Sequence, residues 1–150
     1  MRHNVPLIID DRIDVALAVE ADGVHLGADD MPVKAARRLL GAGKIIGATA
    51  KTVETALAAQ NAGADYLGVG AVYPTNTKVK TVLTPVATIK DICRAVNIPV
   101  MAIGGLNPGN LDILLSSGVS GICVVSAIMN SADPGLTTRD LAYSVKRILS

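Results

Sequence analysis

One stretch of the sequence concentrates side chains that bind anions. Residues 70–78 read GAVYPTNTK and directly follow the apolar run 66–69. A plain connector needs only one or two turn residues, whereas this stretch carries two threonine hydroxyls, an asparagine amide and Lys78. Such groups donate the hydrogen bonds that oxyanions accept. We therefore expect residues 70–78 to project from the end of a strand and to hold an anion.

Two later segments could contribute to the same kind of site. The apolar runs 100–104 and 121–125 lead into Gly104-Gly105 and Ser126. Adjacent glycines let an oxygen approach the backbone N–H groups closely, and the serine hydroxyl can donate another hydrogen bond. Alone, each segment is more typical of a tight turn or a helix N-cap. As the ends of consecutive strands, they favour a phosphate site.

Pairs of carboxylates follow the first two apolar runs. These are Asp10 with Asp11, and Asp29 with Asp30. Asp11 and Asp30 could share Mg2+, a hard ion that prefers oxygen ligands and accompanies phosphates, and Thr49 would add a hydroxyl at the same edge. The alternative role is helix capping. Capping is favoured for Asp29, and both roles stay open for Asp11 and Asp30.

A regular alternation of elements must position these groups. Short apolar runs, typical of buried strands, are each followed by a stretch with helical spacing. One of these stretches contains Leu111, Leu114 and Leu115 on one face. Six parallel βα units predict an α/β fold that is part of a (β/α)8 barrel. The barrel is favoured because groups that can bind phosphate stand at the ends of the last two predicted strands, as they do in such barrels. An open doubly wound sheet is the alternative. The six predicted strands are 7–10, 24–27, 45–49, 66–70, 100–104 and 121–125.

The composition indicates a globular protein. Half of the 150 residues are apolar and 18% are charged, which excludes disorder and predicts a single domain over residues 1–150. Lysine and arginine number 14 against 13 acidic residues, and only three aromatic residues occur. We therefore expect no nucleic-acid partner and, because no apolar run reaches membrane-spanning length, no membrane association. The two cysteines lack metal-ligand spacing, which predicts reduced thiols and a cytoplasmic location.

Five segments together carry a resemblance to a known family. LIIDDR, ADGVHLGADDMP, GADYLGVGAVYPTNTK, AIGG and VVSAI stand in that order over nearly the whole chain, which closely resembles thiamine-phosphate synthase. The resemblance implies a phosphate-binding TIM barrel. It implies an enzyme that joins hydroxymethylpyrimidine diphosphate to a thiazole phosphate and releases diphosphate. The cofactor implied is Mg2+, which assists the departure of diphosphate from a pyrimidine carbocation.

The resemblance also implies roles for individual residues. Asp11 and Asp30 would be the Mg2+ ligands. The contacts to the pyrimidine diphosphate would come from Asp10, Thr49 and Lys78, with Asp10 adding a negative charge where asparagine is common in the family. The cradle of the thiazole phosphate would consist of Thr75, Thr77, Gly105, Val125 and Ser126.

The chain also departs from the family pattern. It begins at what would be the third strand, so the expected domain is an N-terminally truncated barrel without the Gln-x-Arg-x-Lys motif that grips the pyrimidine diphosphate. Ala28 stands where glutamine is usual. Six strands leave the edges 7–10 and 121–125 unpaired, which predicts association with a second copy or with another chain.

Two other interpretations stay open. One is a thiazole tautomerase, a relative with the same fold. The other is a non-catalytic phosphate-binding subunit whose barrel is completed by a partner.

His25 lies between Val24 and Leu26 inside a predicted strand. This position favours a hydrogen-bonded core imidazole over a catalyst.

Overall fold

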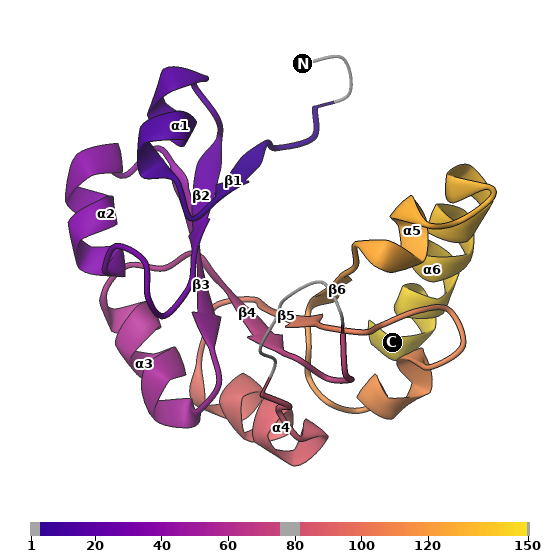
Figure 1. The fold of residues 1–150 in the computed structure, drawn as a ribbon. Coiled ribbons are helices and arrows are strands. Elements are labelled where there is room, and N and C mark those ends of the chain that lie inside the picture. The colour runs from indigo at the N-terminus through magenta and orange to yellow at the C-terminus, as the bar shows by residue number, and fades with distance from the viewer. Residues whose placement is uncertain (1–3, 76–81, 150) are drawn as a thin grey trace.

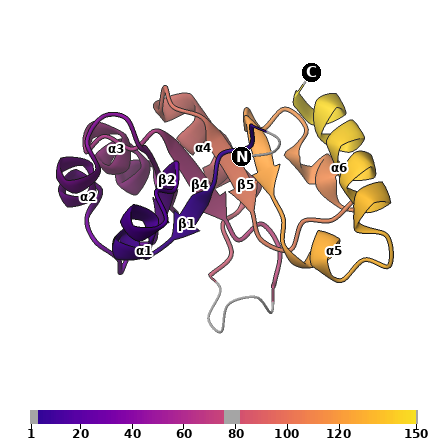
Figure 2. The same cartoon turned by 90° about the horizontal axis from the view of Figure 1, so that it is seen from above.

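The computed structural model describes residues 4–75 and 82–149. In these residues, six parallel strands pair in the order in which they occur in the sequence. The sheet curls into an open arc with the helices on its convex side (Figure 1). Seen from above, α1 to α3 lie at one end of the molecule and α5 and α6 at the other (Figure 2). The strands are β1 (Ile8–Asp10), β2 (Gly23–Leu26), β3 (Ile45–Ala50), β4 (Tyr66–Gly70), β5 (Val100–Ile103) and β6 (Gly121–Cys123).

This strand order confirms the predicted barrel-type fold. A doubly wound sheet reverses its strand order at a switch point, whereas here each strand pairs only with its neighbours in the sequence. The predicted strands agree with the observed ones to within two residues at each end. The parallel pairing also places the carboxyl ends of all the described strands at one edge, and the predicted site residues that the structure describes lie at or just beyond those ends.

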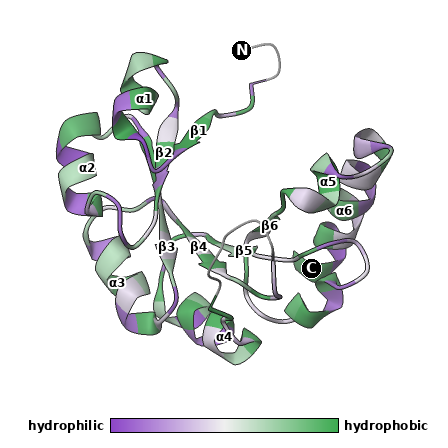
Figure 3. Ribbon diagram, viewed as in Figure 1, coloured by the Kyte–Doolittle hydropathy of each residue, from purple (hydrophilic) through white to green (hydrophobic). Residues whose placement is uncertain are grey.

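The helices cover the sheet with apolar faces and present polar faces to solvent, as their mixed colouring in Figure 3 shows. Described residues contain no helix that is both long and apolar enough to cross a membrane. The helical elements are α1 (Ile13–Ala18), α2 (Val33–Leu40), α3 (Val53–Asn61), α4 (Val86–Ala95), the 3-10 turn η1 (Leu111–Leu114), α5 (Ser126–Met129) and α6 (Pro134–Leu149).

The prediction of an α-helix with Leu111, Leu114 and Leu115 on one face is wrong. The segment forms only the 3-10 turn η1. A 3-10 turn has three residues per turn, so Leu111 and Leu114 share a face and the next residue turns away from it. Accordingly Leu114 is fully buried, while 46% of Leu115 is exposed.

The strands present two different faces because their side chains alternate. The face toward the helices is apolar and buried: it carries Val24, Leu26, Ile46, Ala48, Leu67, Val69, Val100 and Ala102. The inner face of the arc carries the intervening positions. These are Asp10, His25, Thr49, Tyr66, Met101, Ile103 and Cys123. The polar residues of the strands therefore gather on the inner face.

The two neighbouring leucines at the end of η1 make a matched test of this packing. Leu114 packs in the main core with Leu141 and Ile148 of α6. We expect Leu114→Ala to lower the free energy of unfolding by roughly 2–5 kcal/mol, because it leaves a cavity. Leu115→Ala should lower it by about 1 kcal/mol or less. Urea denaturation of both variants measures the difference, and equal losses would contradict the placement of η1.

Candidate active site at the carboxyl ends of the strands

Glycines alternate with large side chains across the inner face. The strand register pairs Asp10 with His25, His25 with Gly47, and Gly47 with Tyr66. A Cβ atom at Gly47 would collide with the Tyr66 ring and with Nδ1 of His25. Gly68 shows the same crowding, since a Cβ atom there would lie 3.0 Å from Cε1 of His25. The glycines therefore supply the space that the neighbouring rings occupy.

His25 joins two hydroxyl groups across three strands. Its Nδ1 lies 3.1 Å from Oη of Tyr66, and its Nε2 lies 3.0 Å from Oγ1 of Thr49. Burial, with added contributions from the charges of Cys123 and Asp10, raises the pKa of Tyr66 to about 12. The phenol therefore keeps its proton at neutral pH. With Tyr66 as donor to Nδ1, Nε2 donates to Thr49, and the Thr49 hydroxyl hydrogen can serve another acceptor.

The expectation for His25 is met only in part. The imidazole is half-buried and hydrogen-bonded, as predicted. However, it faces the inner side, beside the predicted site residue Thr49, and not the core between sheet and helices. Tyr66 also belongs to this cluster and was not predicted to. The period-two alternation is the signal that could have found both, because Val24 and Leu26 face the helices and so direct His25 the other way.

The charge of Asp10 on one edge strand influences Cys123 on the other. Asp10 ends β1, and Cys123 ends β6. Burial, together with the charge of Asp10, raises the pKa of the Cys123 thiol. The charge of Asp10 also contributes to the raised pKa of Tyr66. Asp10 is exposed, so it places a carboxylate at the open side of the arc.

Asp11 stands in a turn immediately after β1. Its backbone has φ 64°, in the left-handed region that aspartate tolerates better than most residues. Its N–H donates to the carbonyl of His25 at 2.8 Å, and the next N–H, of Arg12, returns to the carbonyl of Asp10 at 2.7 Å. These bonds fix Asp11 at the end of β1, and an outlier of this kind is a reason to suspect function.

Asp30 stands in the turn after β2, four residues beyond the end of that strand at Leu26. Its Oδ2 accepts a 2.6 Å hydrogen bond from the N–H of Gly27, the first residue beyond the strand. Within the described parts of the chain its Oδ1 has no hydrogen bond. Because β1 and β2 are neighbours, the structure places Asp11 and Asp30 at the ends of adjacent strands.

The capping roles considered for the aspartates and Ser126 do not occur. The N-cap of α1 is Arg12 and that of α2 is Pro32, and neither helix has a side-chain cap. The prediction that Asp29 caps a helix is therefore wrong, and capping is excluded for Asp11 and Asp30. Pro32 occupies the N-cap position of α2, so Asp29 and Asp30 lie too far before the helix to cap it. Ser126 is the first residue of α5, after the N-cap Val125.

The loops after β4 and β5 are held together by backbone hydrogen bonds. The N–H groups of Val72 and Tyr73 donate to the carbonyls of Ile103 and Gly104, each at 3.0 Å. This brings the start of the predicted anion loop against the paired glycines. Thr75 is half-buried at the end of the described part of this loop. The predicted contacts Thr77 and Lys78 lie outside the described residues.

The sequence matches a family model described as thiamine monophosphate synthase over residues 1–128. The chain belongs to the thiamine monophosphate synthase family. The resemblance seen in the sequence motifs is thereby confirmed, and so is the barrel-type fold it implied.

Individual members of the thiamine monophosphate synthase family are closely similar to this chain in sequence and in structure. Thiamine-phosphate synthase 2 of Streptococcus pneumoniae serotype 4 is 50% identical over 148 residues, which are 99% of this chain and 70% of that protein. Thiamine-phosphate synthase of Lacticaseibacillus paracasei is 49% identical with the same coverage of 99% and 70%. The solved thiamine phosphate pyrophosphorylase from Pyrococcus furiosus has a TM-score of 0.89 at 42% identity, covering 99% of this chain and 71% of that one. The chain thus spans about 70% of the length of these relatives.

The glycines of the inner face can be tested directly in this family member. We expect Gly47→Ala to lower the free energy of unfolding by roughly 1–3 kcal/mol, because the methyl group forces the Tyr66 and His25 rings apart. The control is Gly43→Ala, since a Cβ atom there meets nothing within 4 Å. It should change stability by no more than about 1 kcal/mol. Thermal unfolding measures both, and an unaffected Gly47→Ala protein would contradict the crowding described.

Proposed function

We propose that the chain is a transferase of thiamine biosynthesis, which joins hydroxymethylpyrimidine diphosphate to thiazole phosphate and releases diphosphate. The observation that carries this proposal is the identity of 49–50% to thiamine-phosphate synthases over 99% of the chain. The arrangement of the strand ends supports it, because carboxylates, hydroxyls and a glycine pair share one edge of the sheet.

The reaction breaks the bond between the pyrimidine methylene carbon and a diphosphate oxygen, and the electron pair leaves with diphosphate. The thiazole nitrogen then forms the new C–N bond. Such a step needs stabilisation of the leaving charge, alignment of the nucleophile and exclusion of water, and no general base. The hydrogen-bonded group of His25, Tyr66 and Thr49 suits the pyrimidine, since it offers directed donors and acceptors on an inner face that also carries Met101 and Ile103.

The pyrimidine diphosphate contacts assigned by family resemblance are Asp10, Thr49 and Lys78. We assign the thiazole phosphate to Thr75, Thr77, Gly105, Val125 and Ser126. Support for the second set comes from the backbone bonds that pack the β4 loop against the Gly104-Gly105 turn. The roles of Thr77 and Lys78 stay predictions from the sequence.

We assign Mg2+ to Asp11 and Asp30, and two carboxylates at adjacent strand ends fit this ion. Mg2+ is commonly held by one or two carboxylates together with substrate phosphate oxygens. The described residues include no group of three or more histidine, cysteine or acidic side chains that could hold a metal ion. A site of two carboxylates would therefore take its other ligands from substrate and water. When bound, the ion would neutralise charge on the leaving diphosphate.

The proposed activity is tested by incubating the purified protein with both substrates and Mg2+. We expect thiamine phosphate and diphosphate to form in equal amounts, because each turnover releases one of each. Mass spectrometry of the products measures this. If neither product forms while each substrate alone binds, the protein is a binding subunit and the proposal of catalysis fails.

The metal assignment gives a separate prediction. Asp30→Asn retains an oxygen that can accept from Gly27 but removes the charge. We expect it to weaken diphosphate binding in the presence of Mg2+ by about tenfold or more, the effect of losing one charge-assisted contact. Without Mg2+ the affinity should change little.

Titration calorimetry with diphosphate, with and without Mg2+, measures this effect. The matched control is Asp29→Asn, because Asp29 is exposed next to Asp30 and caps no helix. Equal Mg2+-dependent affinities of the two variants would remove Asp30 from the metal site.

Several expectations from the sequence stay predictions. They are association with a second copy or another chain, a cytoplasmic location, and the absence of nucleic-acid and membrane partners.

A further inference from the structure

The turn after β5 has a backbone that only glycine readily adopts. Gly104 and Gly105 have φ values of 102° and 65°. A Cβ atom at Gly104 would lie 2.5 Å from Cβ of Ala71, and one at Gly105 would lie 2.7 Å from Cβ of Tyr73. Both conformation and space therefore require glycine here. The turn is pressed against the β4 loop, and its peptide groups have fixed orientations.

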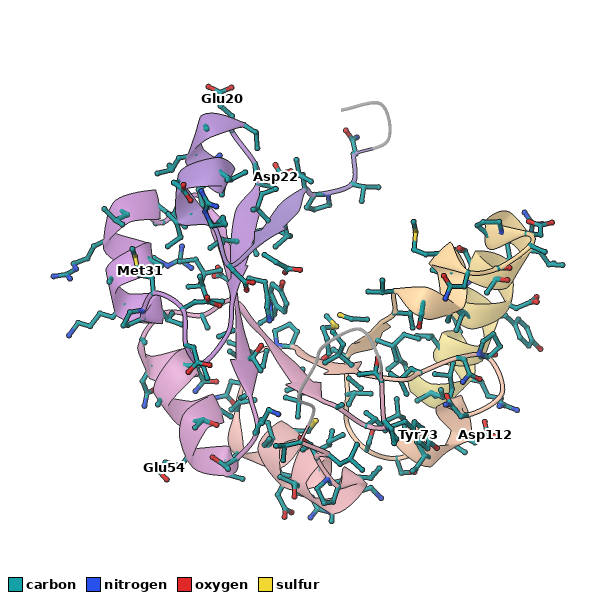
Figure 4. All side chains as sticks on the ribbon, in the orientation of Figure 1. Glu20, Asp22, Met31, Glu54, Tyr73 and Asp112 are labelled. Atoms are coloured by element: carbon teal, nitrogen blue, oxygen red, sulfur yellow. The ribbon has the colours of Figure 1, made fainter. Side chains whose placement is uncertain are left out.

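Two hydrogen bonds fix the carbonyl groups of this turn. The carbonyl of Gly104 accepts from the Tyr73 N–H at 3.0 Å. The carbonyl of Gly105 accepts from Nδ2 of Asn110 at 2.9 Å. Asn110 is itself held in place, because its Oδ1 accepts from the N–H of Asn107 at 2.9 Å. Tyr73 lies near η1 in Figure 4. Its hydroxyl group donates a hydrogen bond to the carbonyl of Asn110 at 3.4 Å.

Fixing a carbonyl also fixes the N–H of the same peptide. In a trans peptide the two groups point in opposite directions, and both peptides of this turn are trans. The Gly105 N–H therefore points away from Tyr73 and the β4 loop. That is the side of β5 on which β6 pairs and Ser126 follows. The Leu106 N–H points away from the Asn110 side chain.

These two N–H groups have no acceptor within residues 4–75 and 82–149. Only 4% of Leu106 is exposed, so its N–H has little access to water. A buried donor without an acceptor is unfavourable and rare in native proteins. Two adjacent donors without acceptors, one of them buried and both near a serine hydroxyl at the next strand end, suit a bound oxyanion.

We propose that Asn110 is a positioning residue for the phosphate group of the substrate: by holding the Gly105 carbonyl, it directs the N–H groups of Gly105 and Leu106 at the anion. The phosphate substrate itself rests on the proposed function, whereas the anion site does not. Asn110 does not touch the phosphate in this arrangement. Its side-chain amide acts through the peptide between Gly105 and Leu106.

The first experiment uses inorganic phosphate as the probe. Titration of the 15N-labelled protein with phosphate should shift the amide signals of Gly105 and Leu106. Asn110→Asp keeps an oxygen for the Asn107 N–H, loses the donor to Gly105 and adds a negative charge. We expect it to weaken phosphate binding by about tenfold or more, because the aimed donors are lost. Asn110→Ala removes the donor to Gly105 without adding a charge and should weaken phosphate binding as well. The matched control Asn107→Ala removes a contact to the Gly109 N–H and leaves the Asn110 amide in place, so its affinity should equal that of the parent.

The second experiment measures KM for each substrate in Asn110→Asp. We expect KM for thiazole phosphate to rise by about tenfold, with KM for the pyrimidine diphosphate within about twofold of the parent and kcat little changed. A residue that merely stabilises the fold would alter both KM values together.

The outcomes separate the two proposals. Phosphate shifts at Gly105 and Leu106 without any thiamine phosphate formation would support the positioning role of Asn110 and overturn the proposed function. Normal catalysis with parental phosphate affinity in Asn110→Asp would overturn the role of Asn110 alone. Phosphate shifts confined to other amides would overturn it as well.

Discussion

The register in which β2, β3 and β4 pair decides which side chains meet on the inner face. Side chains of a strand alternate with a period of two, so a slip of one residue would move every one of them to the opposite face. In the observed register, His25 reaches Tyr66 and Thr49 across Gly47 and Gly68. The same register buries the apolar positions against the helices. One register therefore determines both the core and the arrangement of the site.

The site combines two kinds of construction. On β2 to β4, rigid strands present side chains such as His25 and Thr49, whose positions follow from the pleat. Beyond β5, the useful groups belong to the backbone itself, and hydrogen bonds from neighbouring segments hold the turn that carries them. Side chains can be exchanged without moving a strand, whereas the turn needs glycine twice and a donor from a residue further along the chain.

Local pattern was enough to predict the strands and to place Asp11 and Asp30 at strand ends, because βα periodicity depends only on nearby residues. It could not predict that Asp30 would fold back onto Gly27, since capping and this turn use the same residue types. The η1 segment shows a related limit: two leucines three residues apart, Leu111 and Leu114, fit both a helix and a 3-10 turn. The contact between Asn110 and Gly105 depends on how a loop closes, which no periodicity encodes.

The inner-face glycines restrict how this protein can be made more stable. Replacing glycine by alanine often stabilises a fold by reducing the conformational entropy of the unfolded chain. At Gly47 and Gly70 that route is closed, because a methyl group would collide with the Tyr66 ring or with the backbone carbonyl of Ile103. The unfolded chain must therefore keep its flexibility at these positions. The glycines thus leave space for the side chains of the inner face, but they also give the unfolded chain more conformational entropy, which lowers the free energy of unfolding.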